Sequence, residues 1–375
     1  MTGQAKDKVH FPNLDGLRFL GSLFLIVLHI EGLKMRDSRE VIGFIYGFNK
    51  LGGLAVSLFF VLSGFLITYL LIDEKEKTST INLRKFYFRR ILKIWPLYFL
   101  IGIIGFLLLP KLAYFHGIYS INTGMHFGIS FLLYCLFIPP FSGSLSTGQT
   151  WSVRVEEAFY FIWPLLLRRS KNYLTVFIAV VVFVVVLRNV SSYFVMNYNQ
   201  HVFIILFNLF ESYRISCMAI GGIGAYLYLK GNQKILSIIY RKDLQWLVYI
   251  TTAILLVFQI HIGFILYEAY SALFSFIILN LATNPKSIVN LDYKWMNYLG
   301  KISYGLYMYN AIMRIFCFEF VEYVFNKQIS GWQMNLVLYF TTIGSTILIS
   351  ILSYEYFEKP FLRIKKRFTV IKTEA

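Results

Sequence analysis

Long apolar stretches recur along almost the whole chain, from Leu17 to Ser353, and this repetition limits the possible folds more than any other feature. A helix that crosses the hydrocarbon core of a membrane needs about 20 mostly apolar residues. Only 15% of the residues are charged, whereas a soluble domain carries about 25%. We therefore predict an all-α, polytopic membrane helix bundle with about ten transmembrane helices, at residues 17–33, 52–72, 92–109, 153–167, 173–187, 203–229, 244–261, 263–282, 302–318 and 334–353.

The basic residues indicate how these spans face. With a cytoplasmic N-terminus, 24 of the 36 Lys and Arg residues fall in cytoplasmic segments and 7 in outer loops, among them Lys34 and Arg188. Lys and Arg accumulate on the cytoplasmic side of membrane proteins, so the net charge of +17 requires no nucleic-acid partner. The short stretch 126–138 is interpreted as a re-entrant or interfacial segment, because an extra crossing would place the basic C-terminus outside. We expect a multi-pass protein of a cell membrane (inner or plasma) with both termini cytoplasmic.

Two further features set limits on the chemistry. The three cysteines lie far apart, without the spacing of a zinc or redox site, and no metal is expected. The first apolar stretch lacks a small-residue cleavage site, and we interpret it as a span rather than as a signal peptide.

The first candidate site combines Asp15, Arg18 and His29. Arg18 and His29 are 11 positions apart, which is three helical turns plus roughly 20°, so they project from one face about 16 Å apart. Histidine is the side chain best suited to move a proton near neutral pH. The alternative is a structural histidine in the core, with Arg18 as an anchor at the membrane surface.

The second candidate site is the basic segment 84–96. Arg89, Arg90 and Lys93 follow one another at helical spacing, with Arg89 and Lys93 on one face. Arginine forks match phosphate oxygens, which favours a phosphorylated cytoplasmic ligand. The alternative is an ordinary basic anchor on the cytoplasmic side.

The third candidate site is the acidic pair Glu156 and Glu157, with Trp151 and Tyr160 nearby. At the first turn of a helix the two carboxylates would simply complement the helix dipole. Beside aromatic residues they also suit orienting a histidine or holding a sugar hydroxyl. In the segment 57–68, small residues predict close helix packing, and Ser63 lacks an adjacent base that would make it a nucleophile.

Taken in order, these segments resemble the acyltransferase-3 family of integral membrane acyltransferases. The family patterns are an LDGLR opening, an Arg followed eleven positions later by His, an FFVLSGFLIT helix, an RRxxRxxP segment, a WSLxxExxFYxxxP segment, SYxLYxxH and YxxxExPF. They correspond to Leu14–Arg18, Arg18 with His29, Phe59–Thr68, Arg89–Pro96, Trp151–Pro164, Ser303–Asn310 and Tyr354–Phe361. Two positions differ, because Lys93 replaces the third Arg and Asn310 replaces the late His.

The resemblance implies a single membrane-embedded acyltransferase domain at 1–375, with its core at 13–361, a basic cytoplasmic tail at 362–375 and no fused extracytoplasmic hydrolase-like domain. It implies transfer of an acyl group, expected to be acetyl, from cytoplasmic acyl-CoA to a hydroxyl of a glycan, lipid-linked sugar or similar acceptor outside. Acyl-CoA is a co-substrate, and no further cofactor is expected. Besides acyl-CoA and the acceptor, the partner is membrane lipid, with no nucleic acid.

The expected roles follow from this reaction. The catalytic residues are His29 as general base or acyl carrier, with Glu156 or Asp15 to orient it. The donor-binding residues are Arg18, Arg89, Arg90 and Lys93. The acceptor-binding residues are Trp151, Glu157, Tyr160 and Asn310. A transporter or exporter of a polysaccharide precursor or small solute, and a non-catalytic scaffold, are the alternatives to an enzyme.

Overall fold

The computed structural model describes residues 11–36, 48–111, 125–137, 147–198, 201–325 and 331–368. Every regular element in these ranges is a helix, which confirms the all-α class. The main helices are α1 (Leu14–Arg36), α2 (Phe48–Thr78), α3 (Leu83–Gly102), α5 (Met125–Cys135), α6 (Trp151–Arg169), α7 (Tyr173–Tyr198), α8 (His201–Tyr213), α9 (Ile215–Lys230), α10 (Gln233–Ile239), α11 (Lys242–Val257), α12 (Leu266–Thr283), α13 (Lys294–Lys301), α14 (Ser303–Phe325), α15 (Gly331–Leu352) and α16 (Lys359–Lys365).

Short turns of other helix types extend or connect these elements. Helix α3 continues as a π-helix, η2 (Ile103–Leu108), and ends in a 3-10 turn, η3 (Leu109–Lys111). The other turns are η6 (Gly148–Thr150), η7 (Gly263–Ile265), η8 (Ser353–Glu358) and η9 (Lys366–Phe368).

Seven helical segments in the described ranges are long and apolar enough to cross a membrane. They are Leu14–Met35, Leu51–Thr78, Leu83–Leu108, Tyr173–Tyr198, His201–Lys230, Gly263–Thr283 and Gly331–Phe368. The predicted stretches on α6, α11 and α14 are helical but are not among these seven, so ten spans and cytoplasmic termini stay predictions. Helix α5 has 11 residues and is about 17 Å long, which is too short for a hydrocarbon core of about 30 Å.

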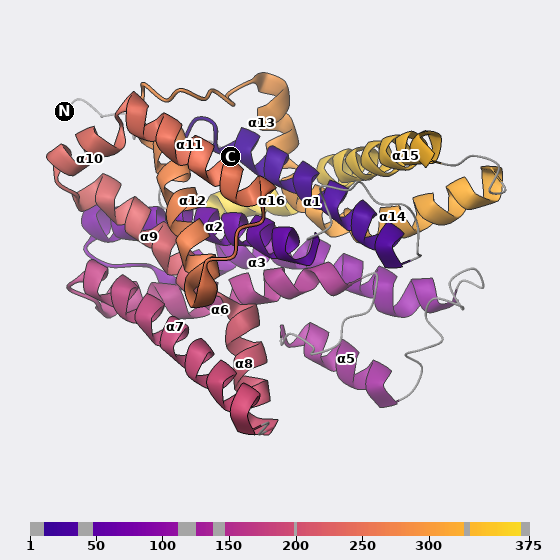
Figure 1. The fold of residues 1–375 in the computed structure, drawn as a ribbon, viewed down its shortest axis with the longest axis horizontal. Helices are drawn as coiled ribbons and strands as arrows, with labels where there is room; N and C mark the ends of the chain where they lie inside the picture. Colours follow the sequence, from indigo (N-terminus) through magenta and orange to yellow (C-terminus); the bar gives the residue numbers. More distant parts are fainter. Residues whose placement is uncertain are drawn as a thin grey trace.

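One end of the bundle, which we call the Leu14 end, gathers the beginning of α1 and the ends of α2, α6 and α12. The Nζ atom of Lys75 donates to the carbonyl oxygens of Leu167 and Ser170, at 2.9 and 2.8 Å. The side chain of Asn13 donates to the carbonyl oxygen of Leu281 at 2.9 Å. Helix α10 lies at one extreme of the long axis, and the end of α14 lies near the other (Figure 1).

Helices α2 and α9 pack so closely that glycine is required at their contact. A methyl group on Gly64 would overlap the main-chain carbonyl of Met218, and one on Gly221 would overlap the carbonyl of Val61. This confirms the predicted packing role of the small residues in the segment 57–68 at Gly64, and small residues let helix backbones approach in just this way.

Residues 362–368 fold back along α3. The rings of Phe88 and Phe368 stack with centroids 5.1 Å apart, and Nη1 of Arg89 donates to the carbonyl oxygen of Phe368 at 2.9 Å. Residues 362–368, which the sequence indicates only as a basic tail, therefore lie against the basic segment 84–96.

Candidate active site

His29 lies on α1, 15 residues after Leu14, and its partner comes from the other end of the sequence. Its Nδ1 is 2.7 Å from Oδ1 of Asn310 on α14. A guanidinium nitrogen of Arg314 donates to the main-chain oxygen of His29 at 3.0 Å. Asn310 is buried, with 1% of its surface exposed, so the structure places this residue, predicted to bind the acceptor, against the imidazole.

The two carboxylates predicted to orient His29 have other hydrogen-bond partners. Asp15 forms an ion pair with Arg18, one turn along α1. Oε2 of Glu156 accepts a hydrogen bond of 3.0 Å from Tyr160, whose hydroxyl oxygen is also 2.5 Å from Oγ of Ser63.

The acidic pair lies inside α6 rather than at its start. Glu156 is the sixth residue of this helix, and its first turn holds no acidic residue, so the helix-dipole interpretation of the pair is wrong. Glu157 accepts a hydrogen bond of 3.2 Å from Nε1 of Trp95. Glu156 and Glu157 both interact electrostatically with Arg90, which lies over the ring of Tyr160 at 5.3 Å. The structure thus brings the acidic pair and the basic segment together.

Four cations from three distant segments gather near the Leu14 end: Arg18, Arg90, Lys93 and Lys365. Lys93 interacts electrostatically with the other three, and Lys365 also does so with Arg18 and Arg90. Lys93 is exposed, and Arg18, Arg90 and Lys365 are partly exposed. We call this group the cation cluster. Lys365 was not among the predicted ligands, because its basic surroundings at the C-terminus indicated only a cytoplasmic tail.

Arg89, the remaining residue predicted to bind the acyl donor, already has two partners within the protein. Its guanidinium contacts Glu74 at 3.3 Å and the carbonyl oxygen of Phe368 at 2.9 Å. Arg89 therefore ties the end of α2 to the C-terminal segment beside the cation cluster.

Polar contacts connect the start of α6 to the turn of α14 that carries Asn310. The hydroxyl of Tyr307 donates to the carbonyl oxygen of Gln149 at 2.6 Å and lies 2.7 Å from Oγ of Ser152. The side-chain amide of Gln149 donates to the carbonyl oxygen of Met308 at 3.0 Å. Trp151, the predicted acceptor-binding residue, opens α6 between Gln149 and Ser152, and its ring packs edge-on against Phe60 with centroids 6.2 Å apart.

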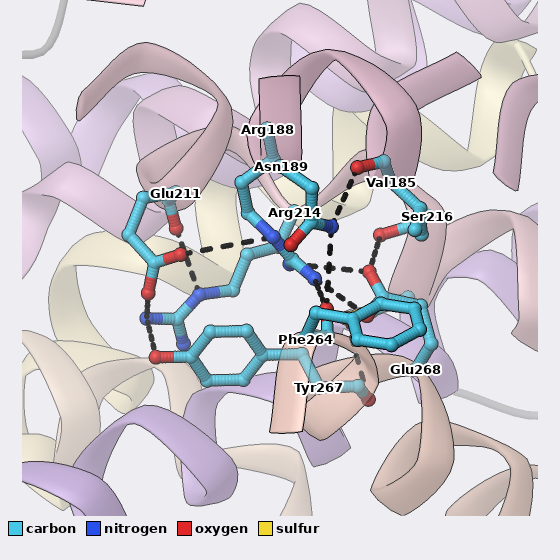
Figure 2. Close-up of polar contacts among 10 residues, drawn as sticks. Val185, Arg188, Asn189, Glu211, Arg214, Ser216, Phe264, Tyr267 and Glu268 are labelled. Atoms are coloured by element: carbon cyan, nitrogen blue, oxygen red, sulfur yellow. Dashed lines mark hydrogen bonds and ion pairs between the residues drawn. The ribbon is translucent and has the colours of Figure 1, made fainter. Parts of the chain in front are cut away.

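A second buried charged group connects α7, α8, α9 and α12, and Figure 2 shows its polar contacts. Arg188 donates to both carboxylate oxygens of Glu268, at 3.2 and 2.9 Å, and Ser216 donates to the same carboxylate at 2.7 Å. Glu211 lies 4.0 Å from Arg188 and 3.8 Å from Arg214. We call these five residues the Arg188–Glu268 cluster.

Arg214 links this cluster to Trp151. It interrupts the helix between α8 and α9 with a φ of 25°. Its guanidinium lies 3.7 Å from the ring centre of Tyr267 and 5.7 Å from that of Trp151, and it donates to the carbonyl oxygen of Gly53 at 2.8 Å.

Two cations predicted to lie in outer loops are instead buried within helices, and these predictions are wrong. Arg188 belongs to α7 and pairs with Glu268, and Lys34 belongs to α1 and pairs with Glu31 at 2.7 Å. Each of these two cations was interpreted as lying in a loop because it is charged. A charged side chain can also be buried within a helix bundle when an oppositely charged group faces it. Acidic residues inside the predicted spans 203–229 and 263–282 were the sequence signal for such partners.

The long apolar helices and the ionisable groups between them define a multi-pass helical membrane protein. Residues 11–355 match the acyltransferase domain family, acyltransferase-3, so the chain belongs to this family, and the enzyme class is that of an acyltransferase.

Proteins with curated names that are similar to this chain include bacterial O-acetyltransferases. O-acetyltransferase OatA of Staphylococcus aureus (strain NCTC 8325 / PS 47) is 25% identical over 381 residues, covering 94% of this chain and 57% of that protein. A protein of Staphylococcus aureus (strain COL), named an O-acetyltransferase as a prediction only, is 27% identical over 383 residues, with the same coverage of 94% and 57%. Peptidoglycan O-acetyltransferase OatA of Listeria monocytogenes is 27% identical over 164 residues, covering 41% of this chain and 24% of that protein.

The chain thus spans about 57% of the length of the first of these relatives. No solved structure matches it.

Proposed function

We propose that this protein is a membrane O-acyltransferase that moves an acetyl group from acetyl-CoA on the cytoplasmic side to a hydroxyl of a cell-envelope glycan on the other side. The observation that carries the proposal is the arrangement along α1. Arg18 belongs to the cation cluster near the Leu14 end, and His29 lies about 16 Å farther along the same face. The names of the relatives support an O-acetyl group and a glycan acceptor.

The cation cluster is proposed to hold the phosphates of coenzyme A. Arg18, Arg90, Lys93 and Lys365 come from α1, α3 and α16 and repel one another, so a bound polyanion would relieve the repulsion. Their exposure leaves them accessible to a ligand. The pantetheine arm would then run along the bundle beside Tyr160 and Glu156, because Arg90 lies over the ring of Tyr160 and Glu156 interacts electrostatically with Tyr307.

His29 is proposed to act as the general base. Its imidazole removes the proton of the acceptor hydroxyl as that oxygen attacks the thioester carbonyl, and the carbon–sulfur bond breaks. The imidazolium then returns the proton to the departing thiolate, which leaves as free coenzyme A. Proton transfer of this kind contributes about 10²–10⁴-fold to the rate. An acyl-His29 intermediate, which the acceptor attacks in a second step, is the other version of the same reaction.

Trp151, at the start of α6, is proposed to bind the acceptor, whereas Glu157 and Tyr160, predicted from the sequence to do so, interact with Arg90 and are proposed to lie on the donor side. The location in a plasma or inner membrane, with both termini cytoplasmic, belongs to the same proposal, because it puts the cation cluster on the side where acyl-CoA is made.

The test is a thiol-release assay with the purified protein in lipid nanodiscs, labelled acetyl-CoA and peptidoglycan fragments. We expect label in the glycan and one free thiol for each acetyl group transferred. His29→Ala is expected to lower the rate by at least about 10²-fold. Another histidine, His261→Ala, is the matched control, because it is exposed in the connection between α11 and η7. Glycan passage across a liposome membrane without thiol release would instead identify a transporter.

A further inference from the structure

The side-chain amide of Asn310 is held in one orientation by its own helix. Its Nδ2 donates to the main-chain oxygen of Leu306 at 3.3 Å and also to that of Tyr307. An amide nitrogen is a donor and an amide oxygen an acceptor. With Nδ2 directed at two carbonyl groups, the oxygen must be the atom that faces His29, as the 2.7 Å contact has it.

This orientation determines where the proton of the neutral imidazole lies. Oδ1 of Asn310 can only accept a hydrogen bond, so Nδ1 of His29 must carry the proton and donate it. In a neutral imidazole the other nitrogen, Nε2, then holds the lone pair. An amide also differs from a carboxylate in this position, because it fixes the tautomer without adding a negative charge beside the ring.

The turn that carries Asn310 is itself anchored. Tyr307, whose carbonyl accepts from Asn310, donates its hydroxyl to the carbonyl oxygen of Gln149 at 2.6 Å. Gln149 in turn donates to the carbonyl oxygen of Met308 at 3.0 Å. Two hydrogen bonds thus fix this turn of α14 to the segment before α6, and Arg314 holds the backbone of His29 from the next turn.

We propose that Asn310 is the positioning residue of the active site and that it holds His29 in the Nδ1–H tautomer, with Nε2 as the nitrogen that takes the acceptor's proton. The inference rests on the proposed acyl transfer. It replaces the expected carboxylate orienter, Glu156 or Asp15, with a neutral amide from a residue 281 positions away.

The tautomer can be measured without any assay of activity. Protein labelled with ¹⁵N-histidine in nanodiscs gives separate nitrogen signals for protonated and unprotonated ring positions, and the His29 signals are those that disappear in His29→Gln. We expect a protonated Nδ1 and an unprotonated Nε2 for His29. An Nε2–H tautomer in the wild-type protein would overturn the proposal.

Substitutions of Asn310 then test the catalytic consequence. Asn310→Leu removes the acceptor oxygen, and we expect kcat to fall by about 10²–10⁴-fold with an unchanged acetyl-CoA KM, because the cation cluster is untouched. Asn310→Asp keeps an oxygen acceptor for Nδ1 but loses the two hydrogen bonds to the carbonyls of Leu306 and Tyr307, so it is expected to retain the Nδ1–H tautomer with a kcat between those of the wild type and Asn310→Leu. Wild-type kcat in Asn310→Leu would contradict the inference.

The outcomes separate this inference from the proposed function. If His29→Ala is inactive while Asn310→Leu keeps its kcat, acyl transfer stands and the positioning role fails. If the wild-type protein releases no thiol, acyl transfer fails, and the nitrogen spectrum still decides whether Asn310 sets the tautomer. If Asn310→Leu does not fold, the nitrogen spectra of the wild-type protein and of Asn310→Asp decide whether Asn310 sets the tautomer of His29.

Discussion

Removing Glu268 tests whether the Arg188–Glu268 cluster holds the bundle together. The side chains of Arg188 and Glu268 are 6% and 8% exposed, and two hydrogen bonds join them, at 2.9 and 3.2 Å. In Glu268→Leu, Arg188 keeps its charge in a buried place and Ser216 loses its acceptor. Removal of one partner from a buried ion pair costs about 3–5 kcal/mol.

The structure places the expected cost near the lower limit of this range. Glu211 lies 4.0 Å from Nε of Arg188 and offers a second, weaker countercharge. We therefore expect Glu268→Leu to lower the free energy of unfolding by about 3 kcal/mol, which is roughly a 150-fold change in the unfolding equilibrium constant. Glu211→Leu is the matched control, and its cost is expected below about 1 kcal/mol, since Glu211 is 32% exposed and its ion pairs are long.

The assay is reversible unfolding of the purified protein by sodium dodecyl sulfate in mixed micelles, followed by tryptophan fluorescence. The double variant Arg188→Met/Glu268→Leu completes the test, because it removes the buried charge that Glu268→Leu leaves unpaired. We expect it to recover most of the lost stability. The assignment of Arg188 and Glu268 as a buried ion pair would be refuted by either of two results. One is a cost below about 1 kcal/mol for Glu268→Leu, and the other is a double variant as unstable as the single one.

Two further predictions concern helix packing and the donor site. Gly64→Ala is expected to destabilise the protein by about 1–3 kcal/mol in the same unfolding assay, because its methyl group overlaps the carbonyl of Met218. Gly52→Ala, on the same helix with no atom within 4 Å of the added carbon, is its control, and equal stability of the two variants would contradict the packing argument. Lys365→Ala is expected to raise the acetyl-CoA KM roughly tenfold, because a charge-assisted phosphate contact contributes about 1.5 kcal/mol, while the exposed Arg367→Ala leaves it unchanged. An unchanged KM in Lys365→Ala would remove this residue from the donor site.

The helices could be predicted from the sequence because hydropathy is a local property. Each predicted span overlaps a helix of the structure, and the short stretch 126–138 coincides with a helix of only 11 residues. The boundaries were less predictable where a charge interrupted an apolar stretch. Arg188 was expected to end a span, yet α7 continues past it to Tyr198 because Glu268 compensates its charge.

The candidate site was predictable only where its residues share one helix. The spacing of Arg18 and His29 places both on one face whatever the rest of the chain does. The partner of His29 was predicted to be the carboxylate of Glu156 or Asp15, whereas it is Asn310, whose amide had been expected to bind the acceptor. The sequence does not show which residues of α1 and α14 are close in space, and therefore it could not identify the residue that orients His29.

From the sequence alone come the membrane-embedded all-helical class, the family patterns and the common face of Arg18 and His29, because apolar length and helical period act over a few turns of one helix. Only the tertiary structure brings Lys365 to Lys93, Asn310 to His29 and Glu268 to Arg188. The last two pairs form because a charged or polar group inside the bundle requires a partner, and packing supplies it from a different helix. Lys365 and Lys93 repel each other and are brought together because the C-terminal segment packs against α3.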